Sequence, residues 1–311
     1  MAKIFKYTLK SNFLSYPFLV AAGVALLAGV IEAFWCIVNG EGQKFENMSL
    51  MSNDTPIILL YIAAVLPSLL TGREFSEGAV RNKIVTGTTR TGFFMSHLIV
   101  NGLIALAMTV LYYIPMFIAC AKYFDHFQPY MVALSMACIF LSLLFVTTLG
   151  TVIAVMLQKT ILSLVAMVFV MFVLSFAANW ITSNLNQPEF IEGTREYGHV
   201  DQFGAYDNKI TEYKEPNPFY VKSKAARKAM WTAYCVMPFG CNMQGAGIIN
   251  GKLTSVQQMH RIWQEAEPEY GRYGSIKELQ DNFFLMPLYL FGSTVVISAA
   301  GLLLFRRRNL K

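Results

Sequence analysis

The segment with the most chemical character is a polar loop, residues 72–92, that lies between two long apolar segments. Its sequence is GREFSEGAVRNKIVTGTTRTG. The acidic residues Glu74 and Glu77 come early in it, and the basic residues Arg81 and Lys83 come late. A helix dipole favours anions near the first turn and cations near the last. This order of charges therefore predicts a short helix within the loop.

The same loop has a partly apolar side. Its apolar members are Phe75, Val80, Ile84 and Val85, and Gly87 offers a stop for the helix. A short amphipathic helix can dock into a partner protein through apolar anchors surrounded by charged residues. Two interpretations are open: a helix that docks a soluble partner, or a solvated loop whose basic residues only fix the orientation of the neighbouring segments.

Glu32 is the one carboxylate inside the long apolar segments. An acidic side chain within a membrane span is costly, and by default it indicates function. The alternative is a carboxylate near the outer interface, hydrated or bonded to a neighbouring helix. Because proton- and sodium-coupled carriers need buried ionisable relays, a single acid argues against that class of transporter.

The five cysteines are too few for a disulfide scaffold, and Cys36, Cys120 and Cys138 lie in apolar stretches. Cys235 and Cys241 flank a Pro-Phe-Gly turn on the side expected to be extracellular. Oxidation there would close a small loop, and the alternative is two separate thiols. The four histidines do not have metal-ligand spacing, and the sequence has no H-E-x-x-H motif, G-x-S-x-G elbow or G-x4-G-K-[ST] phosphate loop. We expect no catalytic residue, metal or cofactor in this chain.

The elements that carry these residues are predicted to be membrane spans. Hydrophobic residues make up 55% of the 311 positions and charged residues 14%, whereas a soluble domain has about a quarter charged residues. A helix needs about 20 mainly apolar residues to cross roughly 30 Å of hydrocarbon. Six segments qualify: 13–38, 55–72, 93–121, 130–157, 160–181 and 283–305. Only Gln158 and Lys159 separate the fourth from the fifth, which predicts a tight antiparallel hairpin.

The basic residues predict how the spans are oriented, because Lys and Arg are enriched in short cytoplasmic loops. With six spans, one side has only Lys44 and Lys122 in its short loops. The other side holds twelve: Lys3, Lys6, Lys10, Arg73, Arg81, Lys83, Arg90, Lys159, Arg306, Arg307, Arg308 and Lys311. We therefore expect a multi-pass protein of the plasma membrane with both termini cytoplasmic. Since these residues flank apolar segments and form no single patch, the net charge of +6 does not indicate a nucleic-acid partner.

The expected fold is an all-α integral membrane protein in four parts. These are an amphipathic interfacial helix (1–12), spans one to five with the cytoplasmic loop (13–181), an extracellular subdomain (182–282), and the sixth span with a basic tail (283–311). The first part has Lys3, Lys6 and Lys10 on one helical face, as in a helix lying against lipid headgroups; the alternative is an ordinary positive flank of the first span. The extracellular subdomain is expected to be mainly helical, because 222–234 and 255–266 have apolar residues at helical spacing.

The loop 72–92 resembles a pattern of a known transporter family. Its residues Glu74, Gly78, Arg81, Asn82, Gly87, Thr89 and Arg90 are similar to the E-x3-G-x2-R-N…G-x-[ST]-R pattern of permease subunits of the ABC-2 type transporter family. The N-terminal KIFKYTLKSNFLSYPF resembles the amphipathic lead-in helix of that family, and the six-span layout also fits. His97 departs from the pattern, because related sequences often carry Lys there, and the outer loop is longer than in compact members.

This resemblance implies the membrane subunit of a bacterial ATP-driven exporter. In that family two permeases, identical or homologous, form the translocation path, and the loop after the second span is a coupling helix that fits a groove of a separate ATPase. Two ATPase subunits would bind here, so this chain would not itself be an enzyme. The residues that the resemblance assigns to ATPase docking are Glu74, Phe75, Glu77, Gly78, Val80, Arg81, Ile84 and Arg90.

Spans with so few charges suit an amphipathic or hydrophobic cargo, such as an antimicrobial peptide or a drug, better than a small ion. Two other classes of function stay open. One is a secondary carrier or channel driven by an ion gradient. The other is a membrane-anchored sensor whose outer subdomain binds a ligand without transport.

Overall fold

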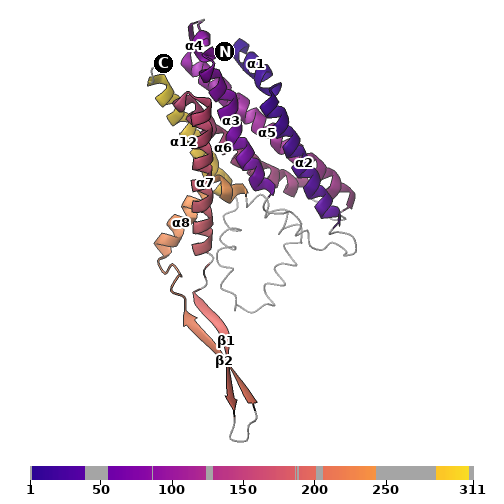
Figure 1. Ribbon diagram of the computed structural model, residues 1–311, viewed down its shortest axis with the longest axis vertical. Helices are drawn as coiled ribbons and strands as arrows, with labels where there is room; N and C mark the ends of the chain where they lie inside the picture. Colours follow the sequence, from indigo (N-terminus) through magenta and orange to yellow (C-terminus); the bar gives the residue numbers. More distant parts are fainter. Residues whose placement is uncertain are drawn as a thin grey trace.

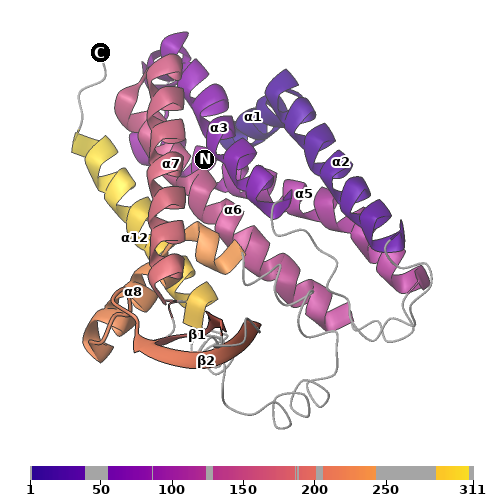
Figure 2. The ribbon, with the colours of Figure 1, turned by 60° about the horizontal axis from the view of Figure 1, so that its bottom comes forward.

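A computed structural model describes residues 2–38, 55–85, 87–123, 129–185, 187, 189–200, 206–242 and 285–307. Its elements are α1 (Ala2–Phe13), α2 (Tyr16–Val38), α3 (Thr55–Ser76), α4 (Ala79–Val85), α5 (Arg90–Tyr123), α6 (Pro129–Leu157), α7 (Thr160–Leu185), β1 (Phe190–Val200), β2 (Tyr206–Pro216), α8 (Lys224–Val236) and α12 (Leu285–Arg307). The long helices form a bundle in which α2 lies along α5, and α6 lies between α3 and α12 (Figures 1 and 2).

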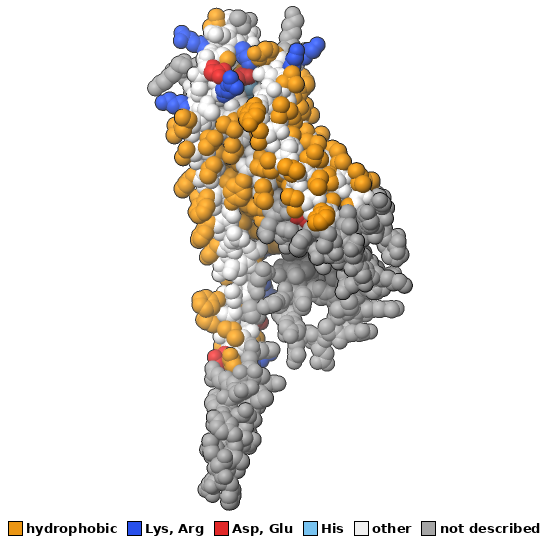
Figure 3. All heavy atoms as spheres, turned by 45° about the vertical axis from the view of Figure 1, so that its right-hand side comes forward, with side chains coloured by type: hydrophobic (Ala, Val, Ile, Leu, Met, Phe, Trp, Pro, Cys, Tyr) orange, Lys and Arg blue, Asp and Glu red, His pale blue; other side chains and the backbone are white. Residues whose placement is uncertain are grey.

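Six of the described helices are long and apolar enough to cross a membrane: α2, α3, α5, α6, α7 and α12. This confirms the prediction of a mainly helical, multi-pass membrane protein. The outer surface agrees with it, because α7 exposes Phe169, Phe172 and Phe176, each at least 65% accessible. Side chains of this kind cover the faces of the bundle, whereas Lys and Arg gather at one end (Figure 3). Apolar surface of this extent is unfavourable in water and suits contact with lipid.

Both termini lie at the end of the bundle that carries α4, and the β-hairpin projects from the opposite end (Figure 1). The exposed basic residues of the α4 end are Lys6, Lys10, Arg73, Arg81, Lys159, Arg306 and Arg307. The predicted tight turn between the fourth and fifth spans is confirmed, since α6 ends at Leu157 and α7 begins at Thr160. Gln158 in this turn adopts a left-handed backbone conformation with φ of 56°.

The N-terminal helix α1 packs against α5. Thr8 and Asn12, one turn apart, are buried on its inner side, while Lys6 and Lys10 are exposed. The chain then turns at Ser15, whose hydroxyl accepts a hydrogen bond from the Phe18 backbone N–H at 3.4 Å. This is the usual arrangement of a residue that caps a helix N-terminus.

Small residues allow the spans to approach closely, as is common where helices pack in lipid. Gly150 of α6 lies against Pro67 and the Ala64 carbonyl of α3. Gly29 of α2 lies directly against the Tyr112 backbone of α5. Larger side chains at these positions would force the helices apart.

Gly29→Ala is expected to destabilise the protein, whereas Gly23→Ala, in the same helix, is expected to be neutral or slightly stabilising. A methyl group at Gly29 would overlap the Tyr112 carbonyl, but nothing lies within 4 Å of a Cβ at Gly23. Overpacking costs about 1–3 kcal/mol, and the better helix propensity of Ala offsets at most about 1 kcal/mol. The apparent melting temperatures of the two variants in detergent would check this; equal values would contradict the close packing of α2 on α5.

The outer region differs from the prediction of a mainly helical subdomain. Residues 190–216 form an antiparallel hairpin in which β1 pairs with β2 from Phe190 opposite Pro216 to Val200 opposite Tyr206. This stretch lacks an apolar stripe of helical period, and its Thr, Tyr, Ile and Val residues favour strands. The helix expected at 222–234 is present as α8, and the one expected at 255–266 lies outside the described residues.

Candidate functional site

The polar loop folds into α4, a seven-residue helix between two glycine breaks. Gly78 and Gly87 have φ of 71° and 97°, angles that other residues rarely adopt. Their N–H groups donate to the carbonyls of Phe75 and Ile84, each at 3.1 Å, and so end α3 and α4. Nothing lies within 4 Å of a Cβ at either glycine, so backbone conformation, not lack of space, requires glycine there. The prediction of a short helix in this loop is confirmed.

Two further residues of the family-like pattern fix the start of α5. The Thr89 hydroxyl accepts a hydrogen bond from the Gly92 N–H at 3.1 Å and caps the helix. Arg90 donates from Nη1 to the Arg306 carbonyl at 3.2 Å and so ties α5 to the last turn of α12. Both residues therefore hold the loop geometry, and the expected contact of Arg90 with a partner does not follow from its position.

Three of the four apolar residues of the loop pack into the chain's own core, and Val85 does not. Val80 is 2% exposed, and Phe75 and Ile84 pack against the same cluster, which contains Phe93 and Phe305. The Phe75 ring meets the Phe93 and Phe305 rings nearly edge-on, at centroid distances of 5.6 and 6.1 Å. The resemblance assigned Phe75, Val80 and Ile84 to ATPase docking; in the structure Val80 is buried and the other two are half-buried. Because α4 is so short, it has a single apolar side. This side already packs against the aromatic cluster between α5 and α12.

The outward side of the same region is charged. Arg73, Glu77, Arg81 and Val85 are exposed, Val85 to 79%. Arg73 Nε lies 2.6 Å from Glu77 Oε1, and the two residues of this ion pair are four positions apart in the sequence. Because both side chains are more than half exposed, solvent screens this pair and it adds little to the stability of the fold. These four residues, which we call the α4 surface, are accessible to a partner.

Glu74 connects four helices. Its Oε2 lies 2.6 Å from Lys83 Nζ of α4 and 3.2 Å from His97 Nε2 of α5. Lys83 in turn lies over the ring of Tyr7 in α1, 4.9 Å from the centroid. The Glu74 and Lys83 side chains are only 12% and 19% exposed. Glu74 therefore fixes the position of α4 from within and is not available as an outward docking contact.

Polar contacts continue from His97 into the interior of the bundle. His97 Nδ1 lies 3.2 Å from Thr71 Oγ1, and Asn101 Nδ2 donates to Thr71 Oγ1 at 3.4 Å and to Thr151 Oγ1 at 2.7 Å. Thr151 donates to the Thr147 carbonyl at 2.7 Å. All these side chains are at most 2% exposed. We call this series, from Lys83 to Thr151, the polar chain; it joins α4 to α3, α5 and α6.

The sequence analysis did not identify the polar chain, although its signal is present in the sequence. Thr71 and Glu74 are three residues apart in α3, and His97 and Asn101 are four apart in α5. Polar residues at these spacings share one face of a helix. Two such faces in neighbouring apolar spans must satisfy each other, because lipid offers no hydrogen bonds.

Glu32 is buried in α2, at 2% exposure, one turn from the contact between Gly29 and Tyr112. Burial excludes the hydrated alternative. Two interpretations of Glu32 remain: a carboxylate that packs or bonds within the bundle, and one that has a function.

Cys235 and Cys241 are both free, buried thiols, so the structure does not contain the disulfide that was one of the two alternatives. The Cys241 thiol donates to the Cys138 carbonyl at 3.5 Å. Burial raises the pKa of Cys235 to about 11. Hydrogen bonding to Cys138, together with burial, raises the pKa of Cys241.

Both thiols are therefore expected to resist alkylation in the folded protein. The thiolate is the reactive form; at pH 8 about one in a thousand Cys235 side chains carries it at a pKa of about 11, against about one in ten at the ordinary value. Labelling should rise as the pH rises, and it should become fast on unfolding. Peptide mapping after N-ethylmaleimide treatment at pH 7 and 9 would measure this. Rapid labelling at pH 7 would show that this region is open.

Among the residues that the structure describes, no three His, Cys, Asp or Glu side chains are placed to hold a metal ion. His126 and His260 lie outside the described residues. Comparison with models of known protein families gave no match, and comparison with curated proteins gave none either.

Proposed function

We propose that this chain is the permease subunit of an ABC exporter of the ABC-2 type and that a separate ATPase binds at α4. The observation that carries the proposal is the construction of α4. The helix lies at the end of the bundle that holds both termini (Figure 1) and is anchored from within, and its exposed Arg81 follows the exposed Arg73 and Glu77 at the end of α3. A helix of this kind transmits a force from a soluble partner to the spans.

The mechanism follows from the anchors. ATP binding would close two ATPase subunits and move the α4 helices of two permeases, which are identical or homologous. Because Val80 is packed between α5 and α12, and Lys83 is held by Glu74 of α3, a displaced α4 takes these spans with it. The spans of the two permeases would then rock between inward-open and outward-open arrangements, with α4 on the cytoplasmic side.

The docking surface in this proposal is the α4 surface: Arg73, Glu77, Arg81 and Val85. It differs from the set that the resemblance assigned, since it replaces the inward apolar residues with outward ones. Charged residues together with one exposed apolar side chain suit a groove of the partner protein that attracts the α4 surface electrostatically and buries little apolar area.

The cargo in this proposal is amphipathic or hydrophobic. Polar residues inside the bundle, apart from Glu32, are mainly neutral Ser, Thr and Asn, and among the described residues none forms an acidic relay through the spans. Such an interior favours an amphiphile over an inorganic ion.

The partner can be tested directly. The tagged chain, extracted from its native membrane in mild detergent, is expected to bring down a polypeptide that contains a phosphate loop, identified by mass spectrometry. ATP hydrolysis by that complex should respond to amphipathic compounds and should stop when the phosphate-loop Lys of the partner is replaced. Flux that depends on an ion gradient and persists with the inactive ATPase would instead establish a secondary carrier. Ligand binding at the outer region without any flux would establish a sensor.

A further inference from the structure

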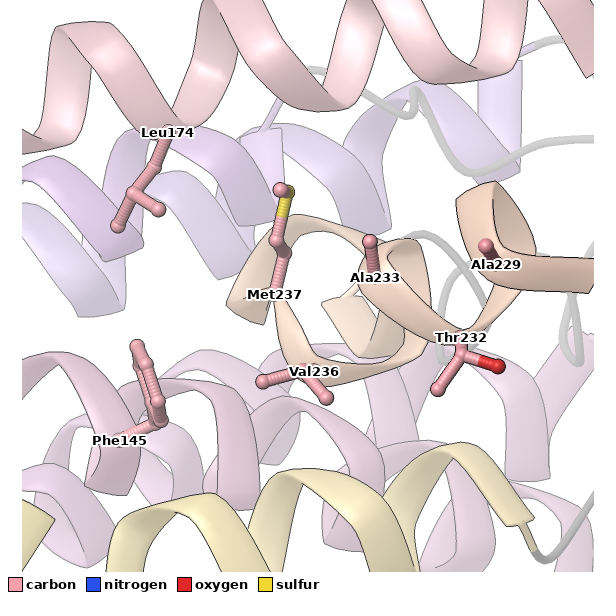
Figure 4. A pocket seen from close by; sticks show the side chains of 7 residues that line it. All are labelled: Phe145, Leu174, Ala229, Thr232, Ala233, Val236 and Met237. Carbon is pink, nitrogen blue, oxygen red and sulfur yellow. The ribbon is translucent and has the colours of Figure 1, made fainter. Parts of the chain in front are cut away.

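Helix α8 and the spans α6 and α7 line an open groove of about 620 Å³ at the end of the bundle opposite α4. We call it the α8 groove; it is lined by Phe145, Leu174, Ala229, Thr232, Ala233, Val236 and Met237. Figure 4 shows Phe145 of α6 and Leu174 of α7 facing each other, with side chains of the α8 segment beside them. Apart from the Thr232 hydroxyl, every lining side chain is apolar. Its volume lies within the range of small-molecule sites, about 300–1,000 Å³.

The depth of the groove places it beside hydrocarbon. The turn between α6 and α7 is bonded to the end of α3, since Ser76 Oγ lies 2.9 Å from Thr160 Oγ1. From that turn, Phe145 and Leu174 lie about 18 and 21 Å along their helices, at about 1.5 Å per residue. In a hydrocarbon core of about 30 Å they fall in the half that is farther from α4. An apolar groove at this depth is exposed to the acyl chains of that leaflet.

The charge of α8 changes along its length. Its first half carries Lys224, Arg227 and Lys228, and its sequence from Lys224 to Val236 contains no acidic residue. Arg227 is engaged in the fold: it donates to the Leu185 carbonyl at 3.3 Å and stacks on the Tyr220 ring. Lys224 and Lys228 are exposed.

Lys228 lies beside the groove. The Thr232 hydroxyl, which lines the groove, donates to the Lys228 carbonyl at 2.9 Å, so Lys228 lies one turn before it along α8. Ala233, Val236 and Met237 follow toward the apolar end. From Lys228 onward, this part of α8 therefore passes from a cation to apolar side chains over about two and a half helical turns, which matches a molecule with an anionic head and a hydrocarbon tail.

We propose that the α8 groove binds an anionic phospholipid of the surrounding bilayer, with one acyl chain between Phe145 and Leu174 and the phosphate near Lys228. The site does not depend on the ATPase or on the identity of the exported cargo. A bound lipid would fill the apolar space between α8 and the spans and so fix the outer region on the bundle.

The test is lipid titration of the purified full chain, monitored by native mass spectrometry. Dioleoyl phosphatidylglycerol and dioleoyl phosphatidylcholine are compared, because they share acyl chains and differ in net charge. We expect tighter binding of phosphatidylglycerol, reduced about fivefold by Lys228→Gln, as expected for one basic residue near a charged headgroup. Ala233→Trp, which fills the groove, should weaken both lipids at least tenfold.

Two matched controls separate the site from general effects. Lys159→Gln removes an exposed lysine at the opposite end, and Val173→Trp places the same indole side chain on α7 at an exposed position outside the groove. Neither should change lipid binding. Equal binding of the two lipids, or equal binding by Ala233→Trp and Val173→Trp, would overturn the proposal. If Ala233→Trp does not fold, the exposed lysine variants still decide it.

Discussion

Glu74→Ala is expected to be among the most destabilising single substitutions outside the apolar core. It removes the carboxylate that holds Lys83 and His97, and leaves a lysine that is only 19% exposed without its counter-charge. Breaking a buried ion pair by removing one partner costs about 3–5 kcal/mol, and residual exposure at this rim reduces that to about 2–4 kcal/mol. For a chain of this size we expect the apparent melting temperature in detergent to fall by about 5–10 °C.

Glu77→Ala is the matched control. Glu77 lies about one turn from Glu74, is more than half exposed and pairs with the exposed Arg73, so its loss should change the melting temperature little. The double variant Glu74→Leu with Lys83→Met removes both charges and should recover most of the stability, because replacing a buried pair by apolar residues is often neutral. Equal melting temperatures for Glu74→Ala and Glu77→Ala would contradict the role of Glu74 as an internal anchor.

Arg81→Glu is expected to reduce association with the ATPase, and with it ATP-driven transport, by at least about tenfold. Arg81 is exposed on the α4 surface, and reversal of its charge puts like charges together where the proposed interface requires complementary ones. The fold should be unaffected, since surface substitutions away from special features usually change stability by less than about 0.5 kcal/mol. The measurements are the amount of ATPase that co-purifies and the rate of nucleotide-dependent transport.

Lys6→Glu is the control for this effect. Lys6 is an exposed cation at the same end of the bundle but lies on α1, so the variant changes net charge equally and leaves the α4 surface intact. Val80→Asp should behave differently from both, because it places a charge in the aromatic cluster and should prevent folding. A complex that survives Arg81→Glu as well as it survives Lys6→Glu would count against docking at α4.

Much of the membrane architecture could be predicted from the sequence because it depends on local properties. Whether a segment of about 20 apolar residues crosses the hydrocarbon depends on that segment alone. The six spans and the two-residue turn at Gln158 follow from that rule. The helix α8 follows from its 3.6-residue period. The hairpin of 190–216 was missed because its two strands, although long, lack a strong alternation of apolar and polar residues and so carry little local signal.

The short helix α4 shows where local pattern stops being sufficient. Gly87 correctly predicted where a short helix ends, whereas Glu74 and Glu77, which were expected near its first turn, precede α4. The apolar residues Phe75, Val80 and Ile84 looked equally suited to a partner's groove or to the chain's own core, since periodicity identifies an apolar side but not what covers it. Only the packing of α5 and α12 around the loop, through Phe93 and Phe305, decided for the core.

The sequence alone determined the six described helices that are long and apolar enough to cross a membrane, and the charged loop that follows the second. The tertiary structure decided which residues of that loop face inward, that Glu74, His97 and Asn101 form one polar chain, and that Cys235 and Cys241 stay apart as buried thiols. The reason is physical. Transfer into lipid depends on each segment by itself, whereas a hydrogen bond such as that between Asn101 and Thr151, 50 positions apart, exists only once the helices are packed.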